Sequence, residues 1–193
     1  KGETKKTFDK NGVIERFKIQ LERSGISNTN NVIKPDFSWA IDQNFEVNEQ
    51  PYIYIAPFCS PKLQHKVWPY FQELIELLKQ NFKNYEILTA PGPSEIGLCK
   101  DLKLKMILNN DKPTNINQLS KIIKKASFVV ANDTGPAHIA AHLNVKGLAL
   151  FGSHTSAKKV SIETNNFKVL EKDNLDKLTA REVLSAVVKQ FPT

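Results

Sequence analysis

Hydrophobic and polar positions change their pattern near residue 50. Beyond that point, short continuous apolar runs alternate with segments in which apolar residues recur at helical spacing. The runs predict strands at 52–57, 85–90, 104–108, 127–132, 145–152 and 167–170. The periodic segments predict helices at 69–82, 116–125, 136–143 and 178–190, and a short helix opened by residues 91–95.

The predicted strands are apolar throughout rather than at every second position. This is typical of strands that are buried on both faces, as in a parallel sheet covered by helices on each side. The alternation of strand and helix therefore predicts an α/β fold with a Rossmann-like parallel sheet. Ligands of such sheets bind beyond the carboxyl ends of the strands, so we expect functional residues in the loops that follow positions 57, 90, 108, 132 and 151.

Residues 1–50 differ from the rest of the chain. The first ten are polar and charged, and apolar residues at helical spacing then predict a helix that has Asn11 as its N-cap and ends near Gly25. The segment 26–50 is rich in loop-forming residues. We interpret 1–50 as the tail of a preceding domain plus a linker, and 51–193 as the ligand-binding domain. The start at Lys1 suggests a piece of a longer protein.

Composition narrows the classes of function. The net charge of +7 fits nucleic acid, an anionic membrane surface or a phosphorylated ligand, but basic residues do not cluster as in nucleic-acid-binding domains. No apolar run reaches the roughly 20 residues of a membrane-spanning helix. Cys59 and Cys99 lack the spacing of a zinc knuckle or a redox pair, which fits small buried residues in a reducing cytoplasm.

The most informative segment runs from Asn132 to Leu143, where a predicted strand gives way to a helix. The N-terminus of a helix attracts anions through its free N–H groups and its dipole. Gly135 allows close approach of a ligand, Thr134 adds a hydroxyl donor, and Pro136 suits the first helical turn. His138 lies within that turn. The segment therefore predicts a site for a diphosphate.

Each of these residues has an alternative role. Asp133 could serve only as an N-cap. His138 and His142 lie four positions apart on one helical face and could hold a metal, but no third ligand is evident, so we predict no metal site. His142 is better explained as a packed or solvated helix residue.

The loop after the first predicted strand supplies two further candidates. Lys66 could reach the phosphates as a point charge, and Ser60 could donate to the same oxygens. Lys66 could equally be a solvated surface lysine. We interpret Trp68 as an anchor in the core and Pro69 as part of the first turn of the next helix.

Glu95 follows the second predicted strand. A carboxylate at this position can accept hydrogen bonds from both hydroxyls of a ribose, as in other doubly wound sheets. It could equally complement the dipole of the short helix that begins there. The sequence leaves both interpretations open.

Together these motifs resemble the glycosyltransferase family that contains the ADP-heptose:lipopolysaccharide heptosyltransferases. The resemblance rests on K-x-W-P at 66–69, a G-x-x-E-like loop ending at Glu95, D-T-G-P-x-H-x-A-A at 133–141, and the F-G pair at 151–152. The order and spacing agree across roughly residues 50–190, and the 133–141 motif is the specific one.

The resemblance implies the carboxyl-terminal, donor-binding half of a GT-B fold. It implies transfer of heptose from ADP-heptose to a lipopolysaccharide core acceptor, with inversion and without a metal or other cofactor. Lys66 and His138 would neutralise the diphosphate, Glu95 would hold the ribose, and the turn 133–136 would hold phosphate and sugar. The acceptor base would come from the amino-terminal domain, so these residues alone would bind donor without transferring it.

The resemblance also implies a cytoplasmic protein that meets a lipid-linked saccharide, and the basic charge is compatible with peripheral contact at the inner face of the inner membrane. One segment departs from the family pattern: residues 153–159 replace a Pro-Thr-Asp-Pro-like turn, which leaves the identity of the sugar open. The sequence leaves two other classes of function open. One is a non-catalytic nucleotide- or phosphate-binding module, and the other comprises further GT-B-like enzymes such as sugar-nucleotide epimerases.

Overall fold

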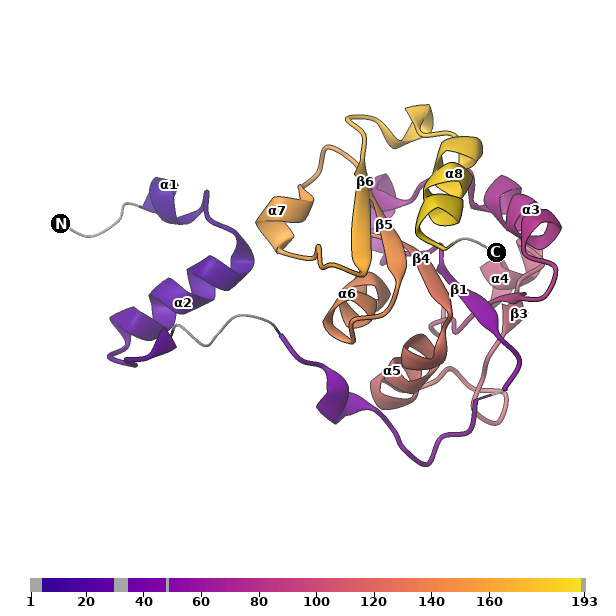
Figure 1. Ribbon diagram of the computed structural model, residues 1–193, viewed down its shortest axis with the longest axis horizontal. Coiled ribbons are helices and arrows are strands. Elements are labelled where there is room, and N and C mark those ends of the chain that lie inside the picture. Colours follow the sequence, from indigo (N-terminus) through magenta and orange to yellow (C-terminus); the bar gives the residue numbers. More distant parts are fainter. Residues whose placement is uncertain (1–4, 30–34, 48, 192–193) are drawn as a thin grey trace.

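The computed structural model describes residues 5–29, 35–47 and 49–191 (Figure 1). The strands are β1 (Tyr52–Ala56), β2 (Glu86–Thr89), β3 (Lys105–Met106), β4 (Phe128–Asn132), β5 (Gly147–Phe151) and β6 (Phe167–Glu171). The helices are α1 (Lys5–Phe8), α2 (Val13–Arg23), α3 (Phe71–Asn81), α4 (Ile96–Asp101), α5 (Ile116–Lys125), α6 (Gly135–His142), α7 (Ala157–Val160) and α8 (Ala180–Gln190). Short 3-10 helices occur at η2 (Ser38–Ala40), η3 (Pro61–Lys66) and η4 (Leu175–Lys177).

The six strands form one parallel sheet in the order β3-β2-β1-β4-β5-β6. The chain runs outward in one direction from β1 to β3 and then returns, so that β1 pairs with both β2 and β4. This is the strand order of the Rossmann fold, and the point between β1 and β4 is its topological switch point. The predicted fold class is confirmed.

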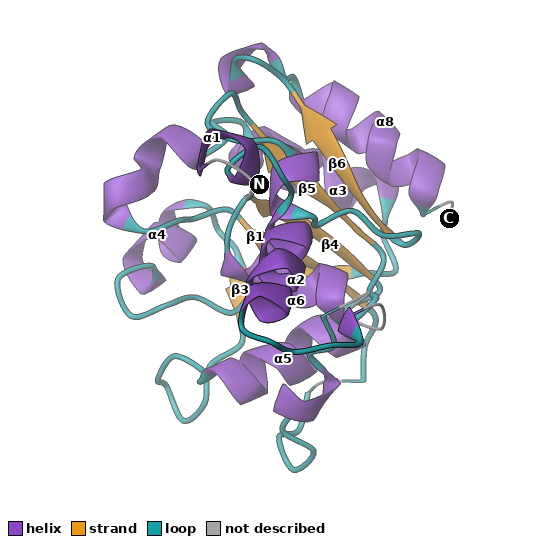
Figure 2. Ribbon diagram, turned by 90° about the vertical axis from the view of Figure 1, so that its left-hand side faces the viewer, coloured by secondary structure: helices purple, strands orange, loops and turns teal. Residues whose placement is uncertain are grey.

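Helices cover both faces of the sheet, which explains why the strands are apolar throughout. In β1, Tyr52 and Tyr54 belong to one buried cluster, whereas Ile53 and Ile55 belong to the other. The first cluster packs against α5 and α6, and the second against α3 and α8 (Figures 1 and 2). Because successive side chains of a strand point to opposite faces, burial of every residue requires cover on both.

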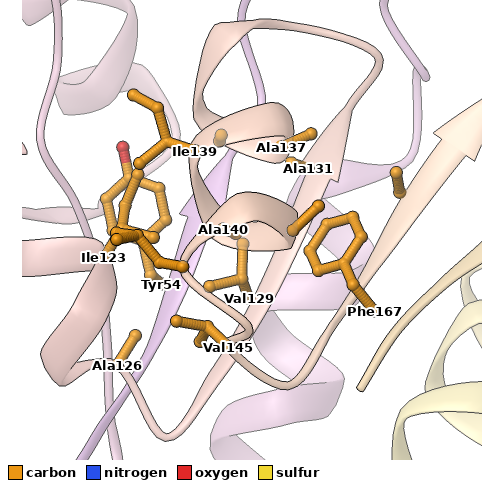
Figure 3. Packing of buried hydrophobic residues seen from close by; sticks show 14 of the residues in the cluster. Tyr54, Ile123, Ala126, Val129, Ala131, Ala137, Ile139, Ala140, Val145 and Phe167 are labelled. Atoms are coloured by element: carbon orange, nitrogen blue, oxygen red, sulfur yellow. The ribbon is translucent and has the colours of Figure 1, made fainter. Parts of the chain in front are cut away.

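Helix α6 packs on the sheet through buried alanines, with its N-terminus beside the ends of the strands. Ala137 and Ala140 are fully buried and face Val129 of β4 and its neighbours (Figure 3). Their small side chains let the helix approach, as the sequence predicted. Close packing continues at Gly147, where an added Cβ would lie 2.8 Å from the carbonyl oxygen of Val129.

Several predicted boundaries differ from the observed ones, and the local structure explains three of them. The third strand is only Lys105–Met106 instead of 104–108, because residues 109–112 turn back on themselves through a bridge between Asn109 and Lys112. Helix α3 begins at Phe71, two residues after Pro69, because Pro69 and Tyr70 form a turn before it.

The N-cap of α2 is Gly12 rather than Asn11. An added Cβ on Gly12 would lie 2.8 Å from Oγ of Ser161 and 2.9 Å from the carbonyl oxygen of Lys158. The helix therefore begins where a glycine lets its backbone approach the end of α7. In the described ranges, no helix has the length and apolarity that a membrane crossing demands.

Candidate functional site

A cavity of about 620 Å³ opens at the carboxyl ends of the central strands. The loops after β1, β2, β4 and β5 contribute to its wall, so it lies at the switch point of the sheet. The structure brings every candidate residue from the sequence to this one cavity: Ser60, Lys66, Glu95, Asp133, Thr134, Gly135, Pro136 and His138.

Asp133 is the centre of a charged network in this cavity. Its side chain is only 4% exposed, and its Oδ2 lies 2.7 Å from Nζ of Lys66 and 2.9 Å from Nε2 of His154. Nε2 of His138 lies 3.4 Å from the other oxygen, Oδ1. A carboxylate accepts hydrogen bonds and repels a phosphate. The geometry therefore indicates that Asp133 orients the basic groups of the site.

The network keeps Asp133 ionised. Burial acts to raise its pKa, but hydrogen bonds with His138, Lys66 and His154, together with the charge of Lys66, outweigh burial and hold the pKa well below its usual value. The negative charge is thus fixed at neutral pH. The Lys66 ammonium and the imidazoles around it are held in place by that charge.

Asn132, the last residue of β4, fixes the two loops that meet at Asp133. Its side chain is fully buried; Oδ1 accepts a 3.0 Å hydrogen bond from the N–H of Trp68, and Nδ2 donates a 2.7 Å bond to the carbonyl oxygen of Pro57. Trp68 is itself buried, and its Nε1 donates to the carbonyl oxygen of Leu178 at 2.7 Å. The prediction that Trp68 anchors the core is confirmed, and these bonds hold the loop of Lys66 against β4.

The N-terminus of α6 faces the same cavity. Thr134 is the N-cap with extended backbone, and its Oγ1 donates to the carbonyl oxygen of Asn132 at 3.3 Å instead of capping the helix. The N–H groups of Ala137 and His138 both point to the carbonyl oxygen of Thr134, at 3.0 and 3.4 Å. The first backbone donor of the helix is therefore Gly135, since Pro136 has no N–H.

Gly135 has no internal reason to be glycine. Its φ angle is not in the left-handed region, and an added Cβ would meet no atom within 4 Å. The space that a side chain would enter is the open cavity. This open space leaves room for the close approach of a ligand that the sequence predicts.

Glu95 and Ser60 lie at the rim of the cavity. Oε2 of Glu95 accepts a 2.8 Å hydrogen bond from the N–H of Gly92, so its side chain turns back over its own loop and does not cap α4. Ser60 is exposed and precedes η3 without capping it.

His154 is the site residue that the sequence analysis missed. It follows β5, is 10% exposed, stacks on the ring of Phe151 with centroids 6.0 Å apart, and meets the ring of His65 edge-on at 5.7 Å. One signal was available: a histidine in the loop after a central strand, within the segment that departs from the family pattern. Its pairing with Asp133 depends on β4 and β5 being neighbours.

The other candidate groups have ordinary environments. Cys59 lies in the wall of the cavity, where its thiol donates to the carbonyl oxygen of Leu63 at 2.9 Å and burial raises its pKa. The rings of His138 and His142 lie 6.1 Å apart. Within the part of the chain that the structure describes, no three His, Cys, Asp or Glu side chains are grouped to hold a metal ion.

A Rossmann-like sheet with a lysine, histidines and a glycine-opened helix at its switch point is typical of the α/β proteins that bind nucleotides. The family model described as glycosyltransferase family 9 (heptosyltransferase) matches residues 8–184. The chain belongs to this family.

Solved structures agree on the fold. The E. coli heptosyltransferase WaaC with ADP has a TM-score of 0.73 at 21% identity, over 91% of this chain and 56% of that one. The E. coli ADP-heptose lipopolysaccharide heptosyltransferase II gives 0.63 at 21% identity, over 79% and 50%. A UDP-GlcNAc 2-epimerase from Methanocaldococcus jannaschii gives 0.54 at 13% identity, over 97% and 45%. No curated protein matches, and the chain spans about half the length of the solved heptosyltransferases.

Proposed function

We propose that this chain supplies the nucleotide-sugar donor site of an inverting glycosyltransferase that transfers heptose from ADP-heptose to a lipid-linked lipopolysaccharide core saccharide. The observation that carries the proposal is the placement of Lys66 and His138 on the carboxylate of Asp133 at the switch point of the sheet. Family membership and the ADP complex of WaaC support the same function.

The order of the polar groups along the edge of the sheet suggests how the donor would lie, from β2 toward β5. Glu95 follows β2, Lys66 follows β1, the turn of Thr134 follows β4, and His154 follows β5. A ribose at Glu95 would place the diphosphate between Lys66 and the N-terminus of α6. The sugar would then lie toward the loop after β5, where this sequence departs from the family pattern.

The chemistry of the site follows from charge. Negative charge grows on the diphosphate as its bond to the sugar breaks. The ammonium of Lys66, the imidazole of His138 and the N–H of Gly135 would stabilise that charge, and Asp133 would hold the first two in position. Groups that are fixed before the reaction need no reorganisation during it, which is why such donors lower the barrier.

Another domain would supply the base that deprotonates the acceptor. Among the described residues that line the cavity, the carboxylates are Asp133 and Glu95. The lowered pKa of Asp133 makes it a poor proton acceptor, and Glu95 accepts from Gly92 at the opposite end of the cavity from His154. We therefore propose that these residues bind donor and do not transfer it. The net charge of +7 would favour peripheral contact with an anionic membrane that carries the acceptor.

Calorimetric titration with ADP tests the donor site. We expect ADP to bind, and His138→Ala and Thr134→Val to weaken binding by roughly tenfold each. The first removes an imidazole beside the proposed diphosphate, and the second removes the hydroxyl that ties the turn before α6 to the carbonyl oxygen of Asn132. Comparing the affinities of ADP, UDP and GDP shows which nucleotide base the site prefers. If a folded sample binds none of the three nucleotides, the donor-site assignment is wrong. If a nucleotide does bind, a thermal-shift comparison of nucleotide sugars would identify the sugar, because a bound ligand raises the unfolding temperature.

A further inference from the structure

His154 connects the charged network of the cavity to the hydrophobic core. Its ring stacks on that of Phe151, with centroids 6.0 Å apart and 17° between the planes, and Phe151 is fully buried at the end of β5. The ring of His65 meets the same imidazole edge-on, at 5.7 Å between centroids. The imidazole of His154 is therefore held by ring packing in addition to its contact with Asp133.

The hydrogen bond between His154 and Asp133 has one possible direction. Asp133 stays ionised, because the effect of burial is outweighed by hydrogen bonds with three basic side chains, which lower its pKa. An ionised carboxylate accepts hydrogen bonds and has no proton to donate. Nε2 of His154, which lies 2.9 Å from Oδ2 of Asp133, must therefore carry the hydrogen and donate it.

Oδ2 of Asp133 is shared between His154 and Lys66. Nζ of Lys66 lies 2.7 Å from this oxygen, whereas Nε2 of His138 lies 3.4 Å from the other one, Oδ1. Of the three basic side chains, His154 is the least exposed, at 10% against 20% for Lys66 and 33% for His138. The ammonium of Lys66 lies at the end of a flexible four-carbon stem, whereas the imidazole of His154 is a rigid ring. His154 is thus the most firmly held partner of the carboxylate.

We propose that His154 is a positioning residue of the donor site, which acts on the diphosphate through Asp133 and Lys66. The inference rests on the proposed function, because it assumes that a diphosphate enters the cavity. Without the Nε2 donor, the carboxylate would be free to turn about the side-chain bonds of Asp133 and to take Lys66 with it. His154 lies in segment 153–159, so this support is a feature of this chain and is not implied by the family motif.

Three substitutions of His154 separate a hydrogen-bonding role from a packing role. His154→Gln places a donor nitrogen as many bonds from the backbone as Nε2, whereas the shorter amide of His154→Asn falls short of Asp133. His154→Phe keeps an aromatic ring on Phe151 but has no donor. By calorimetry we expect ADP affinity to fall by roughly tenfold in His154→Phe and His154→Asn, and to stay within about threefold of wild type in His154→Gln. A packing role gives the opposite order, with His154→Phe tolerated best, and would overturn the inference.

A double substitution tests whether His154 acts through Lys66. Lys66→Met removes the ammonium, and we expect it to weaken ADP by itself. Adding His154→Phe to this variant should then weaken ADP by less than about twofold more, because the group that His154 positions is already absent. Additive losses would overturn the positioning role, since they would show that His154 contacts the nucleotide itself.

Adenosine tests whether the effect is confined to the phosphates. It should bind His154→Phe within about twofold of wild type, because it lacks the diphosphate that Lys66 would contact. An equal loss for adenosine and ADP would overturn the inference, since it would indicate a general loosening of the fold. Ser153→Ala is the control, because Ser153 is exposed on the same loop and does not line the cavity. It should leave ADP affinity unchanged.

The hydrogen on Nε2 can be observed without any ligand. Long-range ¹H–¹⁵N spectra of the imidazole rings should show it in wild type, and His154→Gln assigns the signal by removing it. A His154 ring that is protonated only at Nδ1 would overturn the inference. If folded wild type binds no nucleotide, the proposed function and this inference fail together. If wild type binds ADP and His154→Phe binds it equally well, this inference alone fails.

Discussion

Nζ of Lys66 lies 2.7 Å from Oδ2 of Asp133, although 67 positions separate the two residues in the chain. The contact exists because β1 and β4 are neighbours and because Asn132 ties their following loops together. It fixes a cation in the cavity by means of a buried anion. The proposed ligand binding would therefore depend on the mutual position of these two loops.

Replacing Asp133 by asparagine should destabilise the fold. The variant keeps the shape of the side chain but leaves Lys66 and His154 without their ionised partner, and we expect the free energy of unfolding at neutral pH to fall by about 1 to 3 kcal/mol. The folded-state pKa of Asp133 is lowered, so its contribution is present above the unfolded value of 3.8 and is lost as pH falls below it. The difference between variant and wild type should therefore shrink toward about pH 3.

Urea unfolding at neutral and acid pH measures both effects. Asp173→Asn is the control, since Asp173 is exposed and the same substitution there should change stability by less than about 0.5 kcal/mol. An Asp133→Asn protein as stable as wild type at neutral pH would contradict the network described for this cavity.

Gly135→Ala should separate ligand binding from stability. The added methyl group meets open space, so we expect an unfolding temperature equal to or above that of wild type, because alanine loses less entropy on folding. The same methyl group would occupy the approach to the helix N-terminus, and ADP binding should weaken by about 1 to 3 kcal/mol. Calorimetry and thermal unfolding give the two readings.

Gly97→Ala is the matched control, because Gly97 on α4 also has no atom within 4 Å of an added Cβ but does not line the cavity. It should leave ADP affinity unchanged. Equal ADP affinity in both variants would show that no ligand approaches Gly135.

His142 should make stability depend on pH. Burial and, to a smaller extent, the charge of His138 lower its folded-state pKa below the ordinary value of 6.5. The unfolded chain then binds the proton more readily than the folded one. The free energy of unfolding is therefore independent of His142 above about pH 6.5 and declines as pH falls below that value. His142→Gln should flatten this decline, measured by urea unfolding from about pH 7.5 to 5.5. An identical pH dependence in wild type and variant would exclude His142 as its source.

Asn132→Ala should be among the more destabilising single substitutions in the described structure. It leaves the N–H of Trp68 and the carbonyl oxygen of Pro57 buried without their partner, and we expect a loss of about 2 to 4 kcal/mol. ADP binding should weaken as well, because the loop of Lys66 loses its attachment to β4. Asn117→Ala, at an exposed position of α5, should change stability by less than about 0.5 kcal/mol in the same urea titration.

The sequence predicted the sheet and its two helical layers because short strands that are apolar at every position must be buried on both faces. It also placed Lys66, Glu95 and the turn 133–138 in loops that do meet at one cavity. The fifth strand was predicted as 145–152 and is Gly147–Phe151, an ordinary difference at element ends.

What the sequence did not predict depends on contacts between distant residues. His154 shows no periodicity or motif, and its role appears only once β5 lies beside β4. Asp133 carried the most specific motif, yet its pairing with Lys66 and His154 from two other loops, besides His138 of α6, could not be read from spacing. The start of α2 at Gly12 likewise depends on the surface of α7 against which that glycine packs.

The fixed charge of Asp133 has a consequence for turnover. A diphosphate that enters this cavity meets an ammonium and imidazoles whose attraction is partly offset by a carboxylate less than 3 Å from Lys66 and His154. Under the proposed function, a nucleotide would therefore be held less tightly than unopposed cations would hold it. The proposed enzyme must release a nucleoside diphosphate in every cycle, so this balance would favour product release, and removing the carboxylate would slow it.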